Sequence, residues 1–449
     1  MARTSLSIPA IKADLSKRPL LEVTDLKTYF HTEEGEIRAV DGVSFQLMRG
    51  RTLAIVGESG CGKSVTAYSL LRLVNPPGEI VGGSVRLHGA LGEPPVDVLA
   101  LDEDAEELYE VRGGRAAFIF QEASAALSPV HTVGSQMCEA VRLHQRVTKK
   151  GAKRLSIDLL ESVGIADPAL SFSQYPHELS GGMRQRVMIA MALASDPDLL
   201  IADEPTTALD VTIQAQVLNL LEQLQKKNGM SILLITHDLG VVSRLADEVL
   251  VMYLGKVVER APVSTLLKKP RHPYTIGLLN SLPSLTPVGQ RLPSIRGSVP
   301  SLADIPPGCP FHPRCQYAEP GRCNVGGPPP LERLLLPSRA PFPPASQPAP
   351  EGPSSARSLA APEFEHAVAC WRVREIALER LLQRPPPSEL DDAEAEAAAA
   401  AATQSQPPPS EPEGSQHELT PGSRAQATEE AWFEAGERVS KPPGGDRAP

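Results

Sequence analysis

The fold of this chain is decided by residues 57–64, which read Gly57-Glu58-Ser59-Gly60-Cys61-Gly62-Lys63-Ser64. An apolar run, Thr52 to Val56, precedes them, and a helical pattern continues to about Val74. Strand, glycine-rich loop and helix in this order are the context that identifies a phosphate-binding P-loop. The glycines let backbone N–H groups turn toward phosphate oxygens, and the following helix adds the positive end of its dipole. A glycine-rich turn that happens to contain lysine is the alternative, and the context favours triphosphate binding.

The residue types of this loop predict separate tasks at a bound nucleotide. Lys63 is expected to reach the β- and γ-phosphates and to take part in catalysis, while the Ser64 hydroxyl is expected to hold Mg²⁺. We predict that all eight residues of the loop and the next residue, Val65, bind the nucleotide.

Composition limits what the rest of the chain can be. Its 449 residues allow two or three domains, and 44 Lys+Arg against 54 Asp+Glu give a net charge of −10, which argues against a nucleic-acid partner. No run approaches the ~18 uncharged apolar residues of a membrane span, and residues 1–17 lack a signal-peptide core. We therefore expect a cytoplasmic chain that acts at membranes through a partner. Most of the 45 prolines follow Pro262, which predicts one compact domain, an irregular extension and a disordered tail.

Hydrophobic patterning predicts an α/β fold with a largely parallel sheet covered on both faces. Strands are expected at 20–30, 40–47, 52–56, 81–88, 116–120, 199–202, 231–235 and 249–253. The strand at 249–253 is expected to be the last strand of the fold. The strand at 81–88 is assigned to an antiparallel layer. Helices are expected at 63–74, from 102 onward, at 131–164, 180–193 and 212–227, with a loop at 165–178.

A pair of carboxylates follows the apolar strand 199–202. At a strand end near a P-loop, one carboxylate can hold Mg²⁺ while its neighbour faces the attacking water. We assign Asp203 to the metal and Glu204 to the general base. In isolation, two solvated acids at a strand end would be the simpler interpretation.

The most specific motif of the chain is Leu179-Ser180-Gly181-Gly182-Met183-Arg184-Gln185. It resembles the LSGGQ signature of ATP-binding-cassette (ABC) ATPases, with Met183 where Gln is commoner. A serine and two glycines at a helix N-terminus offer a hydroxyl, open N–H groups and a dipole to a phosphate. On its own the stretch would be interpreted as a simple helix cap.

The resemblance implies functions for further residues of this sequence. Gln121 matches the glutamine that touches Mg²⁺ and couples to the membrane partner, and residues 207–210, ending in Asp210, look like the loop that communicates across a dimer. His237 matches the switch histidine that contacts the γ-phosphate. Phe30 lies where the family places a ring on the adenine, with Tyr29 as the competitor. Without the family, a histidine at a strand end and a ring at a sheet edge would be interpreted as structural.

The resemblance also implies architecture, cofactors and partners. It implies an ABC cassette with a RecA-like parallel core sheet, an antiparallel β layer and a helical subdomain, binding ATP and Mg²⁺. The P-loop of one subunit and the signature of another would sandwich ATP. Because this chain carries a single cassette, it is expected to pair with an identical or homologous ATPase subunit, on two multi-span permease subunits served by an extracytoplasmic binding protein.

The segment after the cassette indicates the branch of the family. Residues 269–283 resemble the extension of oligopeptide/dipeptide importer ATPases, as do residues 81–84, 125–129 and 308–315. Ser128 departs from the usual Asn, and the loop around 89–104 is longer. The sequence is therefore identified as an ATP-hydrolysing subunit of a peptide importer, peripheral on the cytoplasmic face of the inner membrane. The alternatives are the same motor for another cargo such as nickel complexes, a soluble ABC ATPase of translation or repair, and a non-hydrolysing ATP sensor.

Four cysteines form a second candidate site: Cys309, Cys315, Cys323 and Cys370. Their spacing matches no standard zinc template, but four thiolates can hold a [4Fe–4S] cluster with varied spacing. The resemblance implies a cluster in some family members. A cluster, zinc and unligated thiols all stay open.

The expected domain organisation follows from these segments. It comprises a flexible N-terminus (1–17), the ABC ATP-binding domain (18–262), a cysteine-containing extension (263–325) completed by residues 364–383, a proline-rich insertion (326–363) and a disordered low-complexity tail (384–449). A short amphipathic helix is expected at 371–382.

Overall fold

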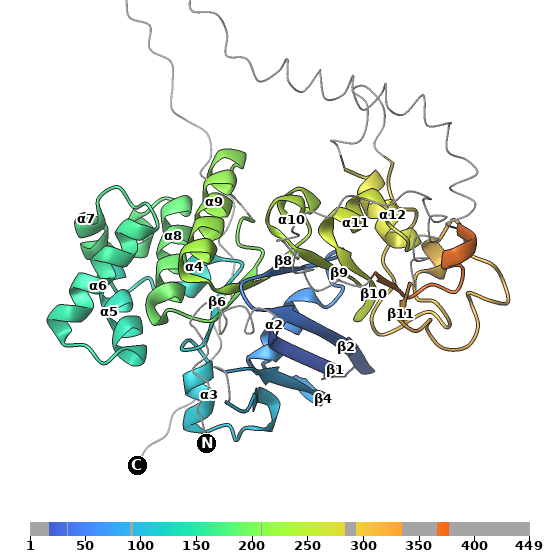
Figure 1. Ribbon diagram of the computed structural model, residues 1–449, viewed down its shortest axis with the longest axis horizontal. Coiled ribbons are helices and arrows are strands. Elements are labelled where there is room, and N and C mark those ends of the chain that lie inside the picture. Colours follow the sequence, from blue (N-terminus) through green and yellow to red (C-terminus); the bar gives the residue numbers. More distant parts are fainter. Residues whose placement is uncertain are drawn as a thin grey trace, which may run out of the picture. The chain divides into compact units, whose positions relative to one another are not determined.

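A sheet of eight strands forms the centre of the fold (Figure 1). The computed structural model describes residues 18–33, 35–89, 93–207, 209–282, 293–334 and 366–376, all within one unit that spans residues 1–383. In spatial order the strands are β11 (Glu332–Arg333), β12 (Ala367–Val368), β10 (Lys256–Pro262), β9 (Glu248–Tyr253), β3 (Thr52–Val56), β8 (Ser231–Thr236), β7 (Leu199–Asp203) and β6 (Ala116–Ile119).

The five strands from β9 to β6 are parallel, and the three at the other edge are antiparallel. Strand β3 lies in the middle and every one of its residues is buried. Leu53 and Ile55 face one hydrophobic core, while Ala54 and Val56 face another. This alternation explains why the strand preceding the P-loop reads as a continuous apolar run.

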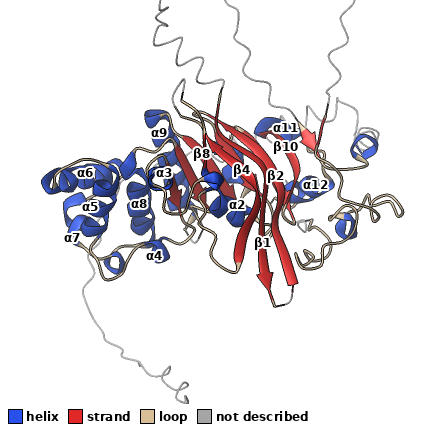
Figure 2. Cartoon of the chain, turned by 90° about the horizontal axis from the view of Figure 1, so that it is seen from below, coloured by secondary structure: helices blue, strands red, loops and turns tan. Residues whose placement is uncertain are grey.

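A second, antiparallel sheet covers one face of the centre (Figure 2). Its order is β2 (Gly35–Met48), β1 (Pro19–Thr32), β4 (Gly78–Leu87) and β5 (Val96–Asp97). Helix α2 (Lys63–Leu70) packs between the two sheets, because its Ala67 and Leu70 join the same core as residues of β1, β2 and β3.

Helices complete the covering of the core sheet. One group lies beyond its β6 edge: α4 (Ala123–Ala126), α5 (Val133–His144), α6 (Lys149–Ser162), α7 (Pro168–Ser173) and α8 (Gly181–Ala192) (Figure 1). The others are α3 (Glu106–Val111), α9 (Val211–Asn228), α10 (Leu239–Leu245), α11 (Val263–Lys268) and α12 (Pro273–Asn280). The predicted cassette architecture, with its parallel core, antiparallel layer and helical subdomain, is confirmed.

Several local predictions were wrong. The helix after the P-loop ends at Leu70 rather than Val74, and the helix predicted at 131–164 is two helices, because residues between His144 and Lys149 leave helical geometry. The predicted loop 165–178 contains α7, whose N-terminus is capped by Asp167. Strand β9 does not complete the sheet, since β10, β12 and β11 extend it.

Strand β11 lies within the segment predicted as a proline-rich insertion. The remainder of that insertion (335–363), the N-terminus 1–17, the tail 384–449 and most of the helix predicted at 371–382 lie outside the described residues.

Candidate functional site

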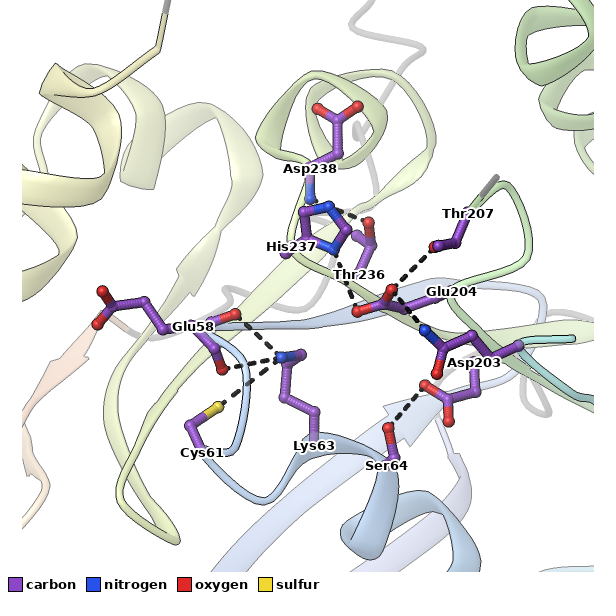
Figure 3. A network of polar contacts seen from close by, with 12 residues as sticks. Glu58, Cys61, Lys63, Ser64, Asp203, Glu204, Thr207, Thr236, His237 and Asp238 are labelled. Carbon is purple, nitrogen blue, oxygen red and sulfur yellow. Dashed lines mark hydrogen bonds and ion pairs between the residues drawn. The ribbon is translucent and has the colours of Figure 1, made fainter. Parts of the chain in front are cut away.

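The P-loop connects β3 to α2 and folds around the amino group of Lys63 (Figure 3). The Nζ atom of Lys63 donates hydrogen bonds to the carbonyls of Gly57 and Glu58, each at 3.0 Å, and the residue is 5% exposed. The sulfur of Cys61 is fully buried, 4.0 Å from the same Nζ. Cys61 therefore contributes its backbone to the loop, while its side chain points into the core.

The glycines of the loop are required by close backbone approach. Gly62 has φ +99°, and a Cβ there would lie 2.1 Å from the carbonyl oxygen of Ala39. A Cβ at Gly57 would lie 2.4 Å from the carbonyl oxygen of Met252. Neither position has room for a side chain, so the loop can curl tightly only with glycine.

The carboxyl ends of β7 and β8 bring the predicted catalytic residues to this loop. Since β3, β8 and β7 are adjacent and parallel, their carboxyl ends meet at one edge of the sheet. Ser64 Oγ donates to Asp203 Oδ1 at 3.1 Å, and Asp203 Oδ2 is buried with no hydrogen-bond partner among the described residues. Burial raises the pKa of Asp203, and the charge of Glu204 raises it further against the opposing Ser64 hydrogen bond.

A buried carboxylate oxygen without a partner, next to a serine hydroxyl, is a donor set that suits Mg²⁺. The residues present therefore fit the predicted metal. A divalent cation there would return the pKa of Asp203 toward the ionised range.

Glu204 lies at the mouth of the site in a strained backbone conformation, with φ +45°. Its Oε1 contacts His237 Nδ1 at 3.1 Å, and its Oε2 accepts from Thr207 Oγ1 at 2.8 Å and from Gln121 Nε2 at 3.3 Å (Figure 3). Partial burial favours the neutral acid, but the hydrogen bonds from His237 and Thr207 outweigh it and hold the pKa of Glu204 below its ordinary value. Glu204 is therefore ionised at neutral pH and able to polarise a water molecule.

Most of these residues line one open pocket with a volume of about 760 Å³, but Gly57, Cys61, Asp203 and Thr207 are not part of its lining. Of the predicted residues it contains Phe30, Glu58, Ser59, Gly60, Gly62, Lys63, Ser64, Val65, Gln121, Glu204 and His237. Ile37, Ala39 and Leu302 also line it and were not predicted. Tyr29 is not part of the lining; its hydroxyl donates to Asp41 at 3.0 Å, so Phe30 is the ring at the pocket.

The signature residues lie elsewhere in the same chain. Ser180 caps helix α8 by accepting from the N–H of Met183 at 3.3 Å, and Ser180 and Gly181 are exposed. Asp210 likewise caps α9, accepting from the N–H groups of Thr212 and Ile213 at 3.0 Å. Ser180, Gly181, Gly182 and Asp210 are absent from the lining of the pocket. Ser180, Gly181 and Gly182 lie at a helix N-terminus of the kind that binds anions, whereas the carboxylate of Asp210 already occupies the N–H groups at the start of α9.

The four candidate cysteines come together in the extension. Cys309, Cys315, Cys323 and Cys370 line one small cavity of about 20 Å³. Burial raises the pKa of Cys309, Cys315 and Cys370 to about 11 each. Among the described residues, however, no group of three or more Cys, His, Asp or Glu side chains gathers around a position for a single metal ion.

Two residues of the extension contact the P-loop and were missed by the sequence analysis. Arg314 pairs with the Glu58 carboxylate, and the Tyr274 hydroxyl accepts from the Glu58 N–H at 2.8 Å. Both are more than two hundred residues away from Glu58 in sequence, so no local pattern could have indicated them. In the part of the chain that is described, no helix has the length and apolarity needed to span a membrane.

Comparison with known proteins matches two family models to this chain. The model described as ABC transporter covers residues 40–207, and the model described as oligopeptide/dipeptide transporter, C-terminal region, covers residues 258–323. A putative peptide import ATP-binding protein of Brucella melitensis is 48% identical over 322 residues, 70% of this chain and 94% of its own length. The oligopeptide transport ATP-binding protein AppD of Bacillus subtilis is 50% identical over 300 residues, 67% and 89% of the two chains.

Proposed function

The chain belongs to the ATP-binding subunits of ABC peptide importers, and from this membership we propose how its site works: two chains meet face to face around each ATP. The chain hydrolyses ATP to ADP and phosphate, as its family does. The observation that carries the proposal is the division of the predicted residues. The P-loop, Glu204 and His237 share one pocket, whereas the exposed tip of α8 at Ser180 and Gly181 is outside it. A second chain would supply that tip.

Within each half-site the residues take distinct functions. The ring of Phe30 stacks on the adenine, the loop from Gly57 to Ser64 cradles the phosphates, and Lys63 neutralises their charge. Ser64, Asp203 and Gln121 hold Mg²⁺, which when bound offsets charge on the β- and γ-phosphates. Glu204 accepts the proton of the attacking water, and His237 contacts the γ-phosphate. The open dimer closes when ATP binds and reopens after hydrolysis. The dimer therefore has two states, and the γ-phosphate favours the closed one.

The partners follow from the importer family. The second ATPase subunit is an identical or a homologous chain, and the pair sits on two multi-span permeases at the cytoplasmic face of the inner membrane. An extracytoplasmic substrate-binding protein delivers the peptide. The extension matched at residues 258–323 and the relatives named for peptide import support a peptide cargo over nickel complexes.

The four cysteines are the ligands of a [4Fe–4S] cluster in this proposal. Support comes from the chemistry of the donor set, since four thiols from two segments of the extension line one enclosed cavity. A cluster would lower the raised pKa values of Cys309, Cys315 and Cys370 and hold these side chains as thiolates. Iron and sulfide analysis after anaerobic purification tests this. We expect about four irons per chain, as the cluster formula requires, and a loss in the Cys309→Ser variant. An iron-free and stable chain would refute it.

Hydrogen bonds between the two segments support treating residues 263–325 and 364–383 as one extension. Arg322 donates to the carbonyl of Trp371 at 2.8 Å, and Arg372 donates to the carbonyl of Tyr317 at 2.8 Å.

The experiment that tests the proposed function is purification of the tagged full chain from solubilised membranes. We expect two multi-span permeases to co-purify with it. The matched control is Lys63→Ala, which should keep the permeases while losing ATP binding, since Lys63 is buried in the P-loop rather than on the docking surface. Recovery of the chain without any permease would contradict the transport assignment.

A further inference from the structure

Glu58, the second residue of the P-loop, has a partner for each of its polar groups. Its carbonyl accepts from Lys63 Nζ at 3.0 Å, and its N–H donates to the Tyr274 hydroxyl at 2.8 Å. Its carboxylate pairs with Arg314 through two hydrogen bonds of 2.6 and 2.9 Å. Figure 3 shows that this carboxylate points away from Lys63, while the carbonyl faces it. Two of the three partners come from the extension after the cassette.

Arg314 is held rigidly in place. Only 8% of the residue is exposed, and its guanidinium lies 5.9 Å from the ring centre of Tyr253 and 6.0 Å from that of Phe311. Its Nε donates to the Arg296 carbonyl at 3.1 Å. Two parallel hydrogen bonds between a guanidinium and a carboxylate fix orientation as well as distance. The position of Arg314 therefore sets the position of the Glu58 side chain.

The extension itself is fastened to the core sheet behind this contact. Glu259 of β10 is fully buried and accepts from the N–H groups of Arg271 and His272, at 2.7 and 2.9 Å. Its Oε1 also contacts His366 Nε2 at 2.7 Å. One buried carboxylate thus anchors both the start of α12, which carries Tyr274, and the segment that leads to Cys370.

The turn that carries Arg314 lies between two of the cysteines. It is the short 3₁₀ helix His312–Arg314, with Cys309 before it and Cys315 directly after it. The N–H of Cys309 donates to the carbonyl of Cys323 at 2.8 Å, and the N–H of Cys315 to that of His312 at 3.2 Å. Cys315 is therefore the residue directly after Arg314, whose guanidinium pairs with Glu58 of the P-loop.

We propose that Arg314 is a positioning residue for ATP binding, which acts through Glu58 to hold the P-loop and Lys63 in the geometry that accepts phosphates. The extension then sets nucleotide affinity in addition to any contact with the permeases. A change in the state of the four cysteines would alter ATP affinity through the same ion pair between Arg314 and Glu58. This inference rests on the proposed assignment of residues 57–64 to the triphosphate.

The test measures the equilibrium dissociation constant of a fluorescent ATP analogue for the full chain, with ATP as competitor. Arg314→Met should weaken binding about tenfold, as expected for a coupled charge pair. Arg314→Lys keeps the positive charge but cannot form the two parallel hydrogen bonds of the guanidinium. It should show a smaller loss of ATP affinity while preserving the fold. Glu58→Gln should weaken binding similarly, and the double variant should be no weaker than either single variant.

The matched control is Arg260→Met. Arg260 of β10 also pairs with a carboxylate through two hydrogen bonds, of 2.7 and 2.9 Å to Glu248, but it makes no contact with the P-loop in the described residues. We expect ATP affinity to stay within twofold for this variant. If Arg314→Met and Arg314→Lys lower only the melting temperature and leave ATP affinity unchanged, Arg314 merely attaches the extension and the inference fails. Fully additive losses in the double variant would also overturn it.

Two further variants test separately the proposed ATP site and the proposed link from the cysteines to it. Lys63→Ala should abolish nucleotide binding; if it does not, the proposed ATP site itself is wrong, whatever Arg314 does. Cys309→Ser should change ATP affinity in the wild-type background and leave it unchanged in the Arg314→Met background. An equal change in both backgrounds, or none in either, would refute the link from the cysteines.

Discussion

Two glycine-containing helix tips of this chain, the P-loop and the start of α8, are constrained in opposite ways. At Gly62 a Cβ would lie 2.1 Å from a carbonyl oxygen of the same chain, whereas a Cβ at Gly181 would meet nothing within 4 Å. Lys63 is almost fully buried, while Ser180 and Gly181 are exposed. The fold of the chain explains the glycine in the first case only.

The difference shows where the requirement for each glycine arises. Gly62 is required by the loop's own packing, and none of the described residues of the chain requires a glycine at position 181. If a small residue is needed at Gly181, something outside the chain must approach it. This is the geometry expected when one chain holds the phosphates and another closes over them.

The first prediction concerns Glu204, which lines the pocket formed by the P-loop of its own chain, and it carries the largest expected loss of ATP turnover. Glu204→Gln keeps the shape of the side chain but removes the base, so ATP turnover should fall about 10²- to 10³-fold. Because hydrolysis no longer reopens the closed state, the variant should elute as a dimer in ATP during size-exclusion chromatography.

An acidic residue outside the site provides the control for that experiment. Glu222→Gln changes a half-buried acid that pairs with Lys226 on α9, far along the sequence from the P-loop, and should turn over ATP normally. Full turnover by Glu204→Gln would show that another group takes the proton of the attacking water.

The second prediction tests the exposed tip directly. Gly181→Asp places a carboxylate where none of the described residues of its own chain lies within 4 Å of the new Cβ, at a helix N-terminus that favours negative charge, so stability should be unchanged or slightly raised. The carboxylate would repel a triphosphate presented by another chain. We expect turnover to fall at least tenfold, while the isolated chain binds ATP normally.

Gly327→Asp serves as the control, because a Cβ at Gly327 also meets nothing within 4 Å. It should leave both turnover and binding intact. Normal turnover in Gly181→Asp would mean that the α8 tip is an ordinary capped helix and that the face-to-face dimer is wrong.

The third prediction concerns the adenine end of the pocket. Phe30→Ala should weaken ATP binding about tenfold, within the range of base–aromatic stacking. Tyr29→Phe removes only the hydroxyl that bonds Asp41 and should bind ATP like the wild type. Competition binding with ATP measures both. Unchanged ATP affinity in Phe30→Ala would show that Phe30 is not the ring that stacks on the adenine.

The residues of the pocket were predictable because their signals are local. The P-loop is contiguous in sequence, Asp203 is the last residue of a strand that reads as a buried apolar run, and Glu204 and His237 directly follow such strands. Adjacent parallel strands bring their carboxyl ends together, so placing these residues required only the strand order. The rings at residues 29 and 30 are one position apart, and only the structure shows that Phe30 lines the pocket while the Tyr29 hydroxyl bonds Asp41.

The extension was not predictable in the same way. Strand β10 contains Lys256, Glu259, Arg260 and Pro262, a composition that disfavours a strand. Its buried Glu259 is tolerated because His366, 107 residues later, and two backbone N–H groups satisfy it. The contact from Arg314 to Glu58 spans 256 residues. Hydrophobic periodicity along the sequence does not indicate such pairings, because they form only in the tertiary structure.

The smallest effect is expected from the hydrogen bond of Thr207 to Glu204. This bond and that from His237 lower the pKa of Glu204, so Thr207→Val should raise it and move the acid limb of the kcat/KM profile to higher pH. The sign follows because the base must be ionised, and a higher pKa leaves less of it ionised as the pH falls. The shift should be under about one pH unit, since one hydrogen bond of several is lost. A pH–rate profile of ATP hydrolysis measures it; a shift to lower pH would show that Thr207 stabilises the neutral acid instead. Gly181→Asp, whose carboxylate lies outside the pocket of its own chain, should lower turnover without moving the acid limb. The pH profile therefore distinguishes a change in the P-loop pocket from a change at the tip of α8.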